Sequence, residues 1–384
     1  MTPSRRLRWD PRPNALSVAK AAALASGRRL IDLTVTNPTQ AGIVYPDDLL
    51  TALSDRRAML YQPDAAGILA AREAVAGYYA GHGAQVHPDQ VILTASTSEA
   101  YHYLFKLLAD PGDEVLVPRP SYPLFDFLAG LELLDAVPYR LSDSDPCNLA
   151  TDRTRALISV HPNNPTGSCL TQQQAKFLSM RCASLHMALV ADEVFLDYPV
   201  AGPVPQTMAV LEGGSRYIFS GLSKVCGLPQ MKLGWIVLSG EVEPALREGL
   251  DLIADTYLSV SAPIQWAAID WLRRRFEIQS SILLRIKGND LWLRQWAKEN
   301  GIHYQPPEAG WTAVLELPGT IDEEVLVMRL LTGYGILVQP GYFYEFQGPS
   351  RLVVSLLTPT DDLEEGMSGL KSEMADLMGE KTAK

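Results

Sequence analysis

The fold is decided by SGLSKVCGLPQMKLGW, residues 220–235 of the chain. The stretch follows a strand-like run at residues 216–219 and leads into an apolar run at residues 233–238, so two buried strands joined by a turn are predicted. A lysine at the mouth of such a loop must meet an anion or lose its proton. For Lys224 two interpretations compete: a solvated loop lysine, or a Schiff-base lysine whose amine stays partly neutral and condenses with an aldehyde.

Composition and charge narrow the class of protein. The chain has 384 residues, of which 47% are hydrophobic and 20% charged, so it can form a large globular domain plus a smaller one. Its net charge of -11 argues against general binding to nucleic acid or to an anionic membrane. No apolar run has spanning length, and residues 1–6 lack the apolar segment of a signal peptide. We therefore expect a cytoplasmic protein.

The cysteines are scattered along the chain and have no C-x-x-C spacing. This pattern supports neither a zinc site nor a disulfide framework. We expect reduced, mostly structural thiols and no metal site for Cys147, Cys169, Cys182 and Cys226.

Polar residues follow several predicted strands where each strand ends. Residues 91–94 form one strand, and Ser96 and Thr97 then open a helix, whose free N–H groups and dipole favour an anion. Simple helix capping would explain the same hydroxyl residues. The strand at residues 187–191 ends in Asp192, and a carboxylate in that position is costly unless it meets a cation.

Two more turns follow predicted strands. The sequence N-P-T-G at residues 164–167 comes after the strand at 156–160 and before a helix with a capping box. A bare turn would need the proline and the glycine, but it would not need Asn164. The sequence P-S-Y-P at residues 120–123 carries Tyr122, whose ring would suit core packing.

These motifs, in this order, resemble those of the class I and II aminotransferases, a family of fold-type I pyridoxal-phosphate enzymes. The most specific part is G-x-S-K at Lys224, a cation eight residues later and Gly234 beyond it. The resemblance covers nearly the whole chain. It implies an α/β protein with a large cofactor-binding domain at residues 46–270, built on a mostly parallel seven-stranded sheet. Residues 1–45 and 271–384 would form the N-terminal segment and a smaller α/β domain.

The resemblance also implies how pyridoxal 5'-phosphate is held. Lys224 would form the Schiff base, Asp192 would pair with the pyridine nitrogen, and Asn164 would donate to the phenolate oxygen. Tyr122 would lie face-on to the ring. The remaining cofactor-binding residues that it implies are Ser96, Thr97, Ser223, Lys232 and, across a homodimer interface, Tyr61 of the partner subunit.

This chain departs from the family pattern near the expected cofactor. Phe195 replaces a tyrosine that donates to the phenolate oxygen, and losing that donor should raise the pKa of the Schiff base. Lys232 replaces an arginine and keeps the charge, but it makes a point contact instead of a bidentate one. Thr36 and Ser96 stand where the family usually has glycine.

Substrate-binding residues are implied by the same resemblance. Asn37 belongs to a segment that lies over the substrate, and Trp311 precedes a strand that lines its pocket. Arg351 would hold the α-carboxylate in a bidentate pair, although an arginine entering an apolar strand is also a common edge residue. Tyr257 occupies the position that carries an arginine in dicarboxylate-specific members, which disfavours aspartate and glutamate as substrates.

We therefore predict an aminotransferase that moves an amino group from an L-amino acid to a 2-oxo acid. Other outcomes of the same chemistry are β-elimination as in a C–S lyase, racemisation and cyclisation. These alternatives stay open because Phe195 changes the hydrogen bonding at the Schiff base. A more distant alternative is a non-catalytic ligand-sensing protein. Such regulators carry a DNA-binding domain, and no basic helix-turn-helix segment precedes residue 14 or follows Arg351.

Overall fold

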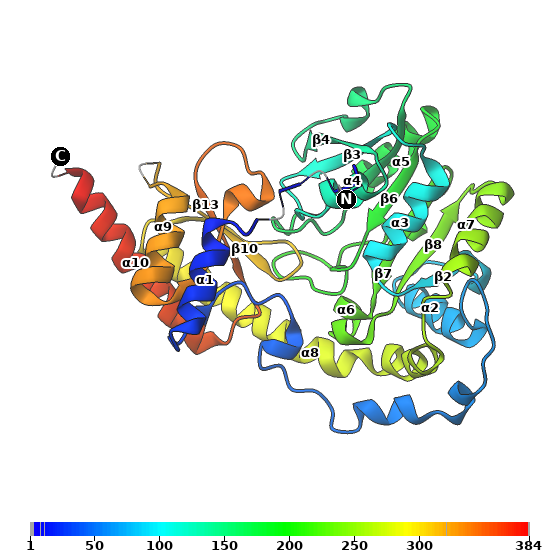
Figure 1. Cartoon of the computed structure of the whole chain (residues 1–384), viewed down its shortest axis with the longest axis horizontal. Coiled ribbons are helices and arrows are strands. Elements are labelled where there is room, and N and C mark those ends of the chain that lie inside the picture. The colour runs from blue at the N-terminus through cyan, green and yellow to red at the C-terminus, as the bar shows by residue number, and fades with distance from the viewer. Residues whose placement is uncertain (1–3, 8, 11, 320, 383–384) are drawn as a thin grey trace.

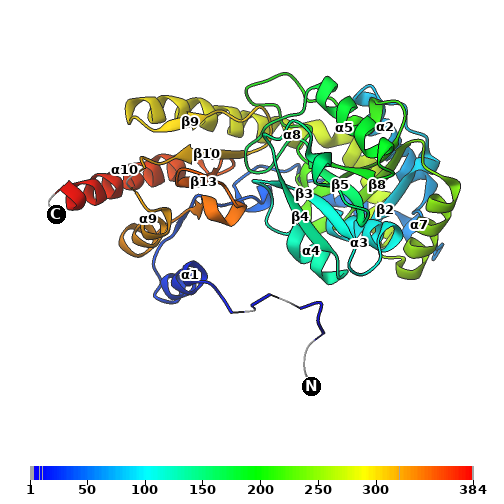
Figure 2. The ribbon, with the colours of Figure 1, turned by 90° about the horizontal axis from the view of Figure 1, so that it is seen from above.

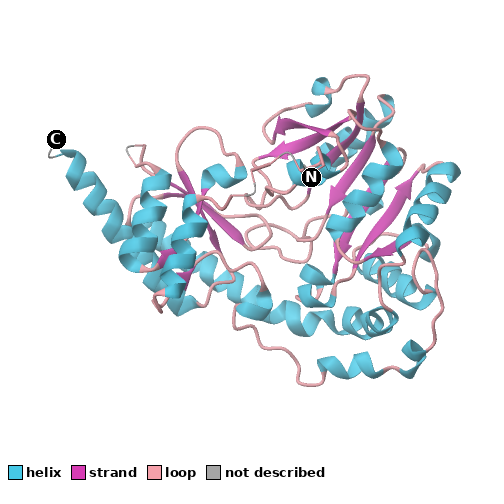
Figure 3. Ribbon diagram, viewed as in Figure 1, coloured by secondary structure: helices cyan, strands magenta, loops and turns pink. Residues whose placement is uncertain are grey.

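The computed structural model describes residues 4–7, 9–10, 12–319 and 321–382. Its strands fall into two main groups, each flanked by helices (Figure 3). The larger group is a seven-stranded sheet and the smaller is a four-stranded sheet. A short parallel pair, β1 (Ile31–Asp32) with β11 (Ile336–Leu337), ties the N-terminal segment to the smaller lobe. The prediction of a large α/β domain with a mostly parallel seven-stranded sheet and a smaller α/β domain is confirmed.

The large sheet brings several strand ends to one edge. All its strands run parallel except β8, which is antiparallel to both of its neighbours. Strands buried on both faces need continuous apolar runs, which is why these segments could be predicted from the sequence. In spatial order the strands are β2 (Val91–Thr94), β8 (Gly234–Gly240), β7 (Ser215–Gly221), β6 (Ala188–Asp192), β5 (Thr154–Val160), β3 (Glu114–Arg119) and β4 (Asp135–Arg140).

Helices cover both faces of this sheet (Figure 2). Successive side chains of a strand point to opposite faces, so Ile236 and Val237 of β8 belong to two different apolar cores. One face packs against α3 (Thr97–Leu108), α4 (Phe125–Leu131) and α7 (Pro244–Tyr257). The opposite face packs against α2 (Leu69–Gly81), α5 (Gln172–Ser184) and α8 (Ala262–Glu299).

The smaller lobe is built on an antiparallel sheet in the order β12 (Gln339–Pro340), β13 (Arg351–Ser355), β10 (Thr312–Glu316) and β9 (His303–Gln305). Helices α1 (Ala15–Ala25), α9 (Glu323–Arg329) and α10 (Thr360–Thr382) surround it (Figure 1). The predicted boundary at residue 270 falls inside α8, which runs without a break from the large lobe to the small one. The boundary therefore stays a prediction.

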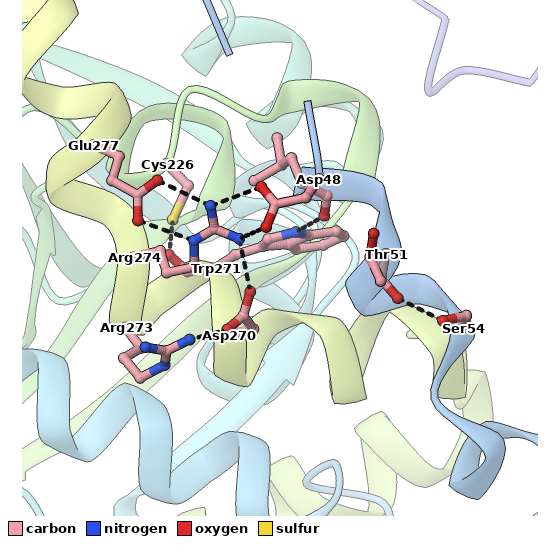
Figure 4. Close-up of polar contacts among 10 residues, drawn as sticks. Asp48, Thr51, Ser54, Cys226, Asp270, Trp271, Arg273, Arg274 and Glu277 are labelled. Atoms are coloured by element: carbon pink, nitrogen blue, oxygen red, sulfur yellow. Dashed lines mark hydrogen bonds and ion pairs between the residues drawn. The ribbon is translucent and has the colours of Figure 1, made fainter. Parts of the chain in front are cut away.

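Helix α8 also contacts Cys226, which lies two residues after Lys224 in the chain (Figure 4). Arg274 of α8 forms an ion pair with Asp48 at 2.9 Å, and the indole N–H of Trp271 donates to the Leu49 carbonyl at 2.9 Å. The thiol of Cys226 in turn donates to the Trp271 carbonyl at 3.5 Å. Cys226 directly follows the one-turn helix α6 (Leu222–Val225), so the position of Lys224 depends on contacts to α8.

Candidate active site

A cavity of about 250 Å³ lies at the carboxyl edge of the large sheet. The ends of β2, β5, β6 and β7 form one side of it, and residues of the smaller lobe, among them Gln339 and Tyr344, form the other. The carboxyl edge of an open α/β sheet is where such folds bind ligands. The cavity brings together nine of the predicted site residues: Ser96, Thr97, Tyr122, Asn164, Asp192, Phe195, Ser223, Lys224 and Trp311.

Lys224 presents its amine to this cavity. Its Nζ atom lies 3.4 Å from the Thr36 carbonyl, 4.7 Å from the centre of the Trp311 ring and 5.5 Å from that of Phe195. Burial lowers the pKa of Lys224 to about 8, although the nearby charge of Asp192 acts in the opposite direction. The hydroxyl of Tyr198 donates to the Lys224 carbonyl at 2.5 Å and fixes the backbone. The amine is thus placed among aromatic rings, where a neutral form is accessible near neutral pH.

Asp192 is the last residue of β6 and is held by two donors. Burial raises its pKa to about 6, while hydrogen bonds and the charge of Lys224 lower it again in part. The hydroxyl of Tyr101 donates to Oδ2 at 3.0 Å, and the backbone N–H of Val194 donates to Oδ1 at 3.3 Å. Tyr101 is not among the site residues predicted from the sequence. A signal for it existed, since Tyr101 lies four residues after Thr97 and so on the same face of the helix.

The N-terminus of α3 forms the polar end of the cavity. Ser96 caps this helix by accepting from the Glu99 N–H at 3.2 Å, and Thr97, Ser98 and Ser223 line the space beside it. A Cβ atom at Gly234 would lie 3.0 Å from the Ser96 carbonyl carbon, so a glycine lets β8 pass close to the helix end. Free N–H groups, hydroxyls and the helix dipole make this end suitable for a phosphate.

Polar atoms without partners indicate that the cavity is built for a ligand. The Oδ1 atom of Asn164 and the indole nitrogen of Trp311 are buried and have no hydrogen-bond partner in the described residues. The Lys224 amine, the Asp192 carboxylate, the side-chain amide of Asn164 and the N-terminus of α3, which all border the cavity, fit a flat phosphorylated ring with a polar rim. The residues present therefore fit pyridoxal phosphate. Across the described ranges, no group of three or more His, Cys, Asp and Glu side chains is placed to hold a metal ion.

Four predicted site residues do not line this cavity. The side chain of Asn37 accepts from the Thr39 N–H at 3.1 Å and caps a 3-10 helix, whereas its neighbour Thr36 does line the cavity. Lys232 is exposed and takes a left-handed conformation with φ of 51°. Tyr61 is exposed and lines a separate hollow of about 200 Å³. The roles of these residues toward cofactor and substrate stay predictions.

Arg351 is the fourth, and it lines a different cavity of about 620 Å³. Its guanidinium lies 3.0 Å from Glu316 Oε2 and donates to the Gln347 carbonyl at 2.8 Å. In the sheet Arg351 pairs with Glu316, while Val353 pairs with Gln339 of the active cavity. To bind a carboxylate in the active cavity, Arg351 would first have to leave Glu316. Its assignment to the substrate also stays a prediction.

Comparison with known proteins identifies the class. The model of the family "Aminotransferase class I and II" matches residues 28–370, so the chain belongs to this family. Among curated relatives, the glutamate-pyruvate aminotransferase AlaA of Escherichia coli K12 is 24% identical over 94% of each chain. The alanine aminotransferase of Mycobacterium tuberculosis H37Rv is 28% identical over 90% of this chain and 86% of that protein. The structure of an alanine aminotransferase from Pyrococcus furiosus has a TM-score of 0.89 and 23% identity, covering 98% of this chain and 100% of that one. The prediction of a class I/II aminotransferase is confirmed.

Proposed function

We propose that this chain transfers the amino group of an L-amino acid to a 2-oxo acid with pyridoxal phosphate held covalently by Lys224. The observation that carries the proposal is the meeting of Lys224, Asp192 and Asn164 in one cavity at the ends of three neighbouring strands. The names of the relatives add a direction for substrates, because they are alanine and glutamate-pyruvate aminotransferases. Alanine and pyruvate are therefore the first substrates to test, followed by glutamate and its 2-oxo acid, which the relatives' names favour and Tyr257 disfavours.

Each cavity residue would have a defined task toward the cofactor. When bound, pyridoxal phosphate supplies an aldehyde that condenses with amines and a ring that withdraws electrons. Asp192, which is mostly charged at neutral pH because its pKa is about 6, would pair with the ring nitrogen. Asn164 would donate to the phenolate oxygen, and Tyr122 would lie on the face of the ring. The phosphate would be bound at the N-terminus of α3 by Ser96, Thr97 and Ser223.

Lys224 would also move the proton of the reaction. With a pKa of about 8, a fraction of its amine is neutral at pH 7. Once an amino acid has displaced it, this amine is a suitable base to take the proton from Cα and then to return it as an acid. The Thr36 carbonyl and the Trp311 ring, which contact Nζ, keep the amine inside the cavity during this exchange.

The visible spectrum of the purified protein with pyridoxal phosphate tests this proposal. We expect a band that Lys224→Ala removes, that Lys176→Ala on the exposed face of α5 leaves intact, and that a subset of amino acids bleaches. Transfer to a 2-oxo acid is then measured as the new amino acid formed. Substantial turnover by Lys224→Ala would sink the proposal. A band that no amino acid bleaches, with pyruvate and ammonia formed from cysteine, would indicate β-elimination instead.

We further propose that the enzyme is a cytoplasmic homodimer with shared active sites. Met59, Leu60 and Tyr61 are largely exposed, and Tyr61 and Leu258 line one hollow, so apolar side chains gather on this surface. A second copy of the chain would cover them. In the described part of the chain, no helix combines the length and apolar character needed to cross a bilayer.

A further inference from the structure

Two of the cysteines, Cys147 and Cys182, lie side by side in the interior of the large lobe. Cys147 belongs to a short 3-10 helix, Pro146–Leu149, and Cys182 lies in the last turn of α5, 35 residues further along the chain. Their Sγ atoms are 4.0 Å apart, both side chains are almost fully buried, and both thiols are free. Neither residue lines the active cavity, so the proposed reaction does not use this pair.

An ion pair holds the two segments together beside the thiols. Arg181, which directly precedes Cys182, pairs with Asp145 at 2.8 Å. Asp145 also caps the 3-10 helix by accepting from the backbone N–H of Cys147 at 3.0 Å. The segment that carries Cys147 is therefore anchored to α5 within two residues of each sulfur, which keeps the two thiols within reach of one another.

The two thiols differ in acidity. The hydrogen bond between them lowers the pKa of Cys147, and the charge of Arg181 acts in the same direction against burial and Asp145. The same hydrogen bond, together with burial, raises the pKa of Cys182 well above its usual range. Burial raises the pKa of Cys169 to about 12. Because the thiolate is the form that reacts with oxidants, Cys147 is the more reactive thiol and Cys182 is the partner beside it.

A cavity of about 370 Å³ adjoins the pair. It is lined by Pro146, which directly precedes Cys147, and by Leu178, which lies one turn before Cys182 on the same face of α5. Tyr139 also lines it, and the pKa of Tyr139 is raised by burial and then by the proximity of both thiols. A small oxidant that enters this cavity therefore comes close to both sulfur atoms.

We propose that Cys147 and Cys182 are a redox modification site that forms a reversible disulfide with hydrogen peroxide as the oxidant. The thiolate of Cys147 attacks a peroxide oxygen, the O–O bond breaks, and the leaving hydroxide takes up the proton that the thiol had lost, so that Cys147 becomes a sulfenic acid. The Cys182 sulfur then displaces the hydroxyl group as a second water, and the S–S bond forms. The two sulfurs lose two electrons, which reduce one peroxide to two waters. In cytosolic proteins disulfides are typically transient bonds of this kind.

Peptide mass spectrometry on the full chain with pyridoxal phosphate tests this proposal. The protein is exposed to hydrogen peroxide, its remaining thiols are alkylated, and it is digested without reduction. We expect peptides joined through Cys147 and Cys182 that are absent before peroxide and lost after dithiothreitol. They should form at least about tenfold faster than any oxidation product of Cys169, whose higher pKa keeps it protonated.

Single variants separate the two steps, and circular dichroism checks that each one folds. In Cys182→Ser the serine hydroxyl can still donate, so Cys147 should stop at the sulfenic acid, which dimedone traps. In Cys147→Ser the thiol of Cys182 should remain unoxidised. Cys169→Ser is the matched control, because Cys169 lines the neighbouring cavity, and it should leave the joined peptides unchanged.

The parent protein alone can overturn the proposal. Joined peptides that form only after unfolding in urea, a bond between Cys147 and Cys169, or no loss of alkylation at either thiol would each do so. The oxidised protein should also unfold at a higher urea concentration than the reduced one, because the bond constrains the unfolded chain. A lower unfolding midpoint would show that the bond does not fit the folded arrangement, and it would overturn the proposal as well.

Discussion

The hydroxyl of Tyr101 is expected to set the pH at which Asp192 carries its charge. It donates to Oδ2 of Asp192 at 3.0 Å, while the ring of Tyr101 is held between Phe125 at 5.6 Å and Phe219 at 4.8 Å. Tyr101→Phe removes this donor and leaves the ring packed as before. The other groups acting on the carboxylate are the Val194 N–H and the charge of Lys224, and neither is altered directly.

The size of the effect follows from the hydrogen bond. Burial raises the pKa of Asp192 to about 6, and the Tyr101 hydroxyl is the largest of the contributions that lower it. A hydrogen bond to a charged group contributes about 1.5 to 3 kcal/mol, and one pKa unit corresponds to about 1.4 kcal/mol. Because the hydroxyl stabilises the charged form, its removal should raise the pKa by about one to two units. Asp192 would then be no more than about half charged at pH 7.

The affinity of the cofactor-free protein for pyridoxal phosphate, measured by equilibrium dialysis from about pH 5 to about pH 9, reports this shift. In the parent protein affinity should increase with a midpoint near pH 6, as Asp192 becomes the charged partner of the ring nitrogen. In Tyr101→Phe the midpoint should lie about one to two units higher. Tyr139→Phe is the matched control, because that buried hydroxyl donates to the Ile158 carbonyl at 2.8 Å. An unchanged midpoint in Tyr101→Phe, or the same shift in the control, would refute the reasoning.

Three further outcomes are expected. Gly234→Ala should weaken binding of pyridoxal phosphate, because its Cβ would lie 3.0 Å from the Ser96 carbonyl carbon. The control Gly77→Ala in α2 meets no atom within 4 Å and should leave binding unchanged. Equal affinities of the two variants for pyridoxal phosphate would contradict this prediction. Phe195→Tyr should lower the pH at which the visible band of the bound cofactor changes, because the added donor favours the deprotonated form, and an upward shift in the absorbance titration would be evidence against it. Mixing inactive Lys224→Ala with impaired Tyr61→Phe should restore activity if Tyr61 serves the partner subunit, and no gain on mixing would count against shared sites.

Among the site residues predicted from the sequence, those that follow strand ends lie together in one cavity, and their roles stay predictions. Asn164, Asp192 and Lys224 each follow a continuous apolar run, and the parallel sheet brings the ends of such runs to one edge. The glycine at residue 234 was equally informative, because close packing of β8 on α3 requires it. The apolar runs predict the strands, and the parallel order of the strands brings their ends to one edge, so both steps can be predicted from a single sequence.

The remaining site residues depend on contacts that no local pattern specifies. Tyr101 was not predicted from the sequence, because its contact with Asp192 arises only when α3 packs against the sheet. The placement of Arg351 depends on the register of β13 against β10 and β12, which sets Arg351 opposite Glu316. A shift of one residue in that register would send the side chain to the other face. The motif located the strand, but it could not fix this alignment.

The two charged groups of the cavity are coupled, and this coupling separates two steps of cofactor binding. The charge of Asp192 raises the pKa of Lys224, which burial otherwise lowers to about 8. Neutralising Asp192 by Tyr101→Phe should therefore lower the pKa of Lys224 further and enlarge the neutral fraction of its amine at pH 7. Covalent capture of the aldehyde by Lys224 should become faster, while retention of the ring should become weaker because its charged partner is lost. Stopped-flow absorbance at pH 7 measures the first step and dilution measures the second. Slower capture of the aldehyde in Tyr101→Phe, together with slower release of the cofactor on dilution, would contradict this coupling between Asp192 and Lys224.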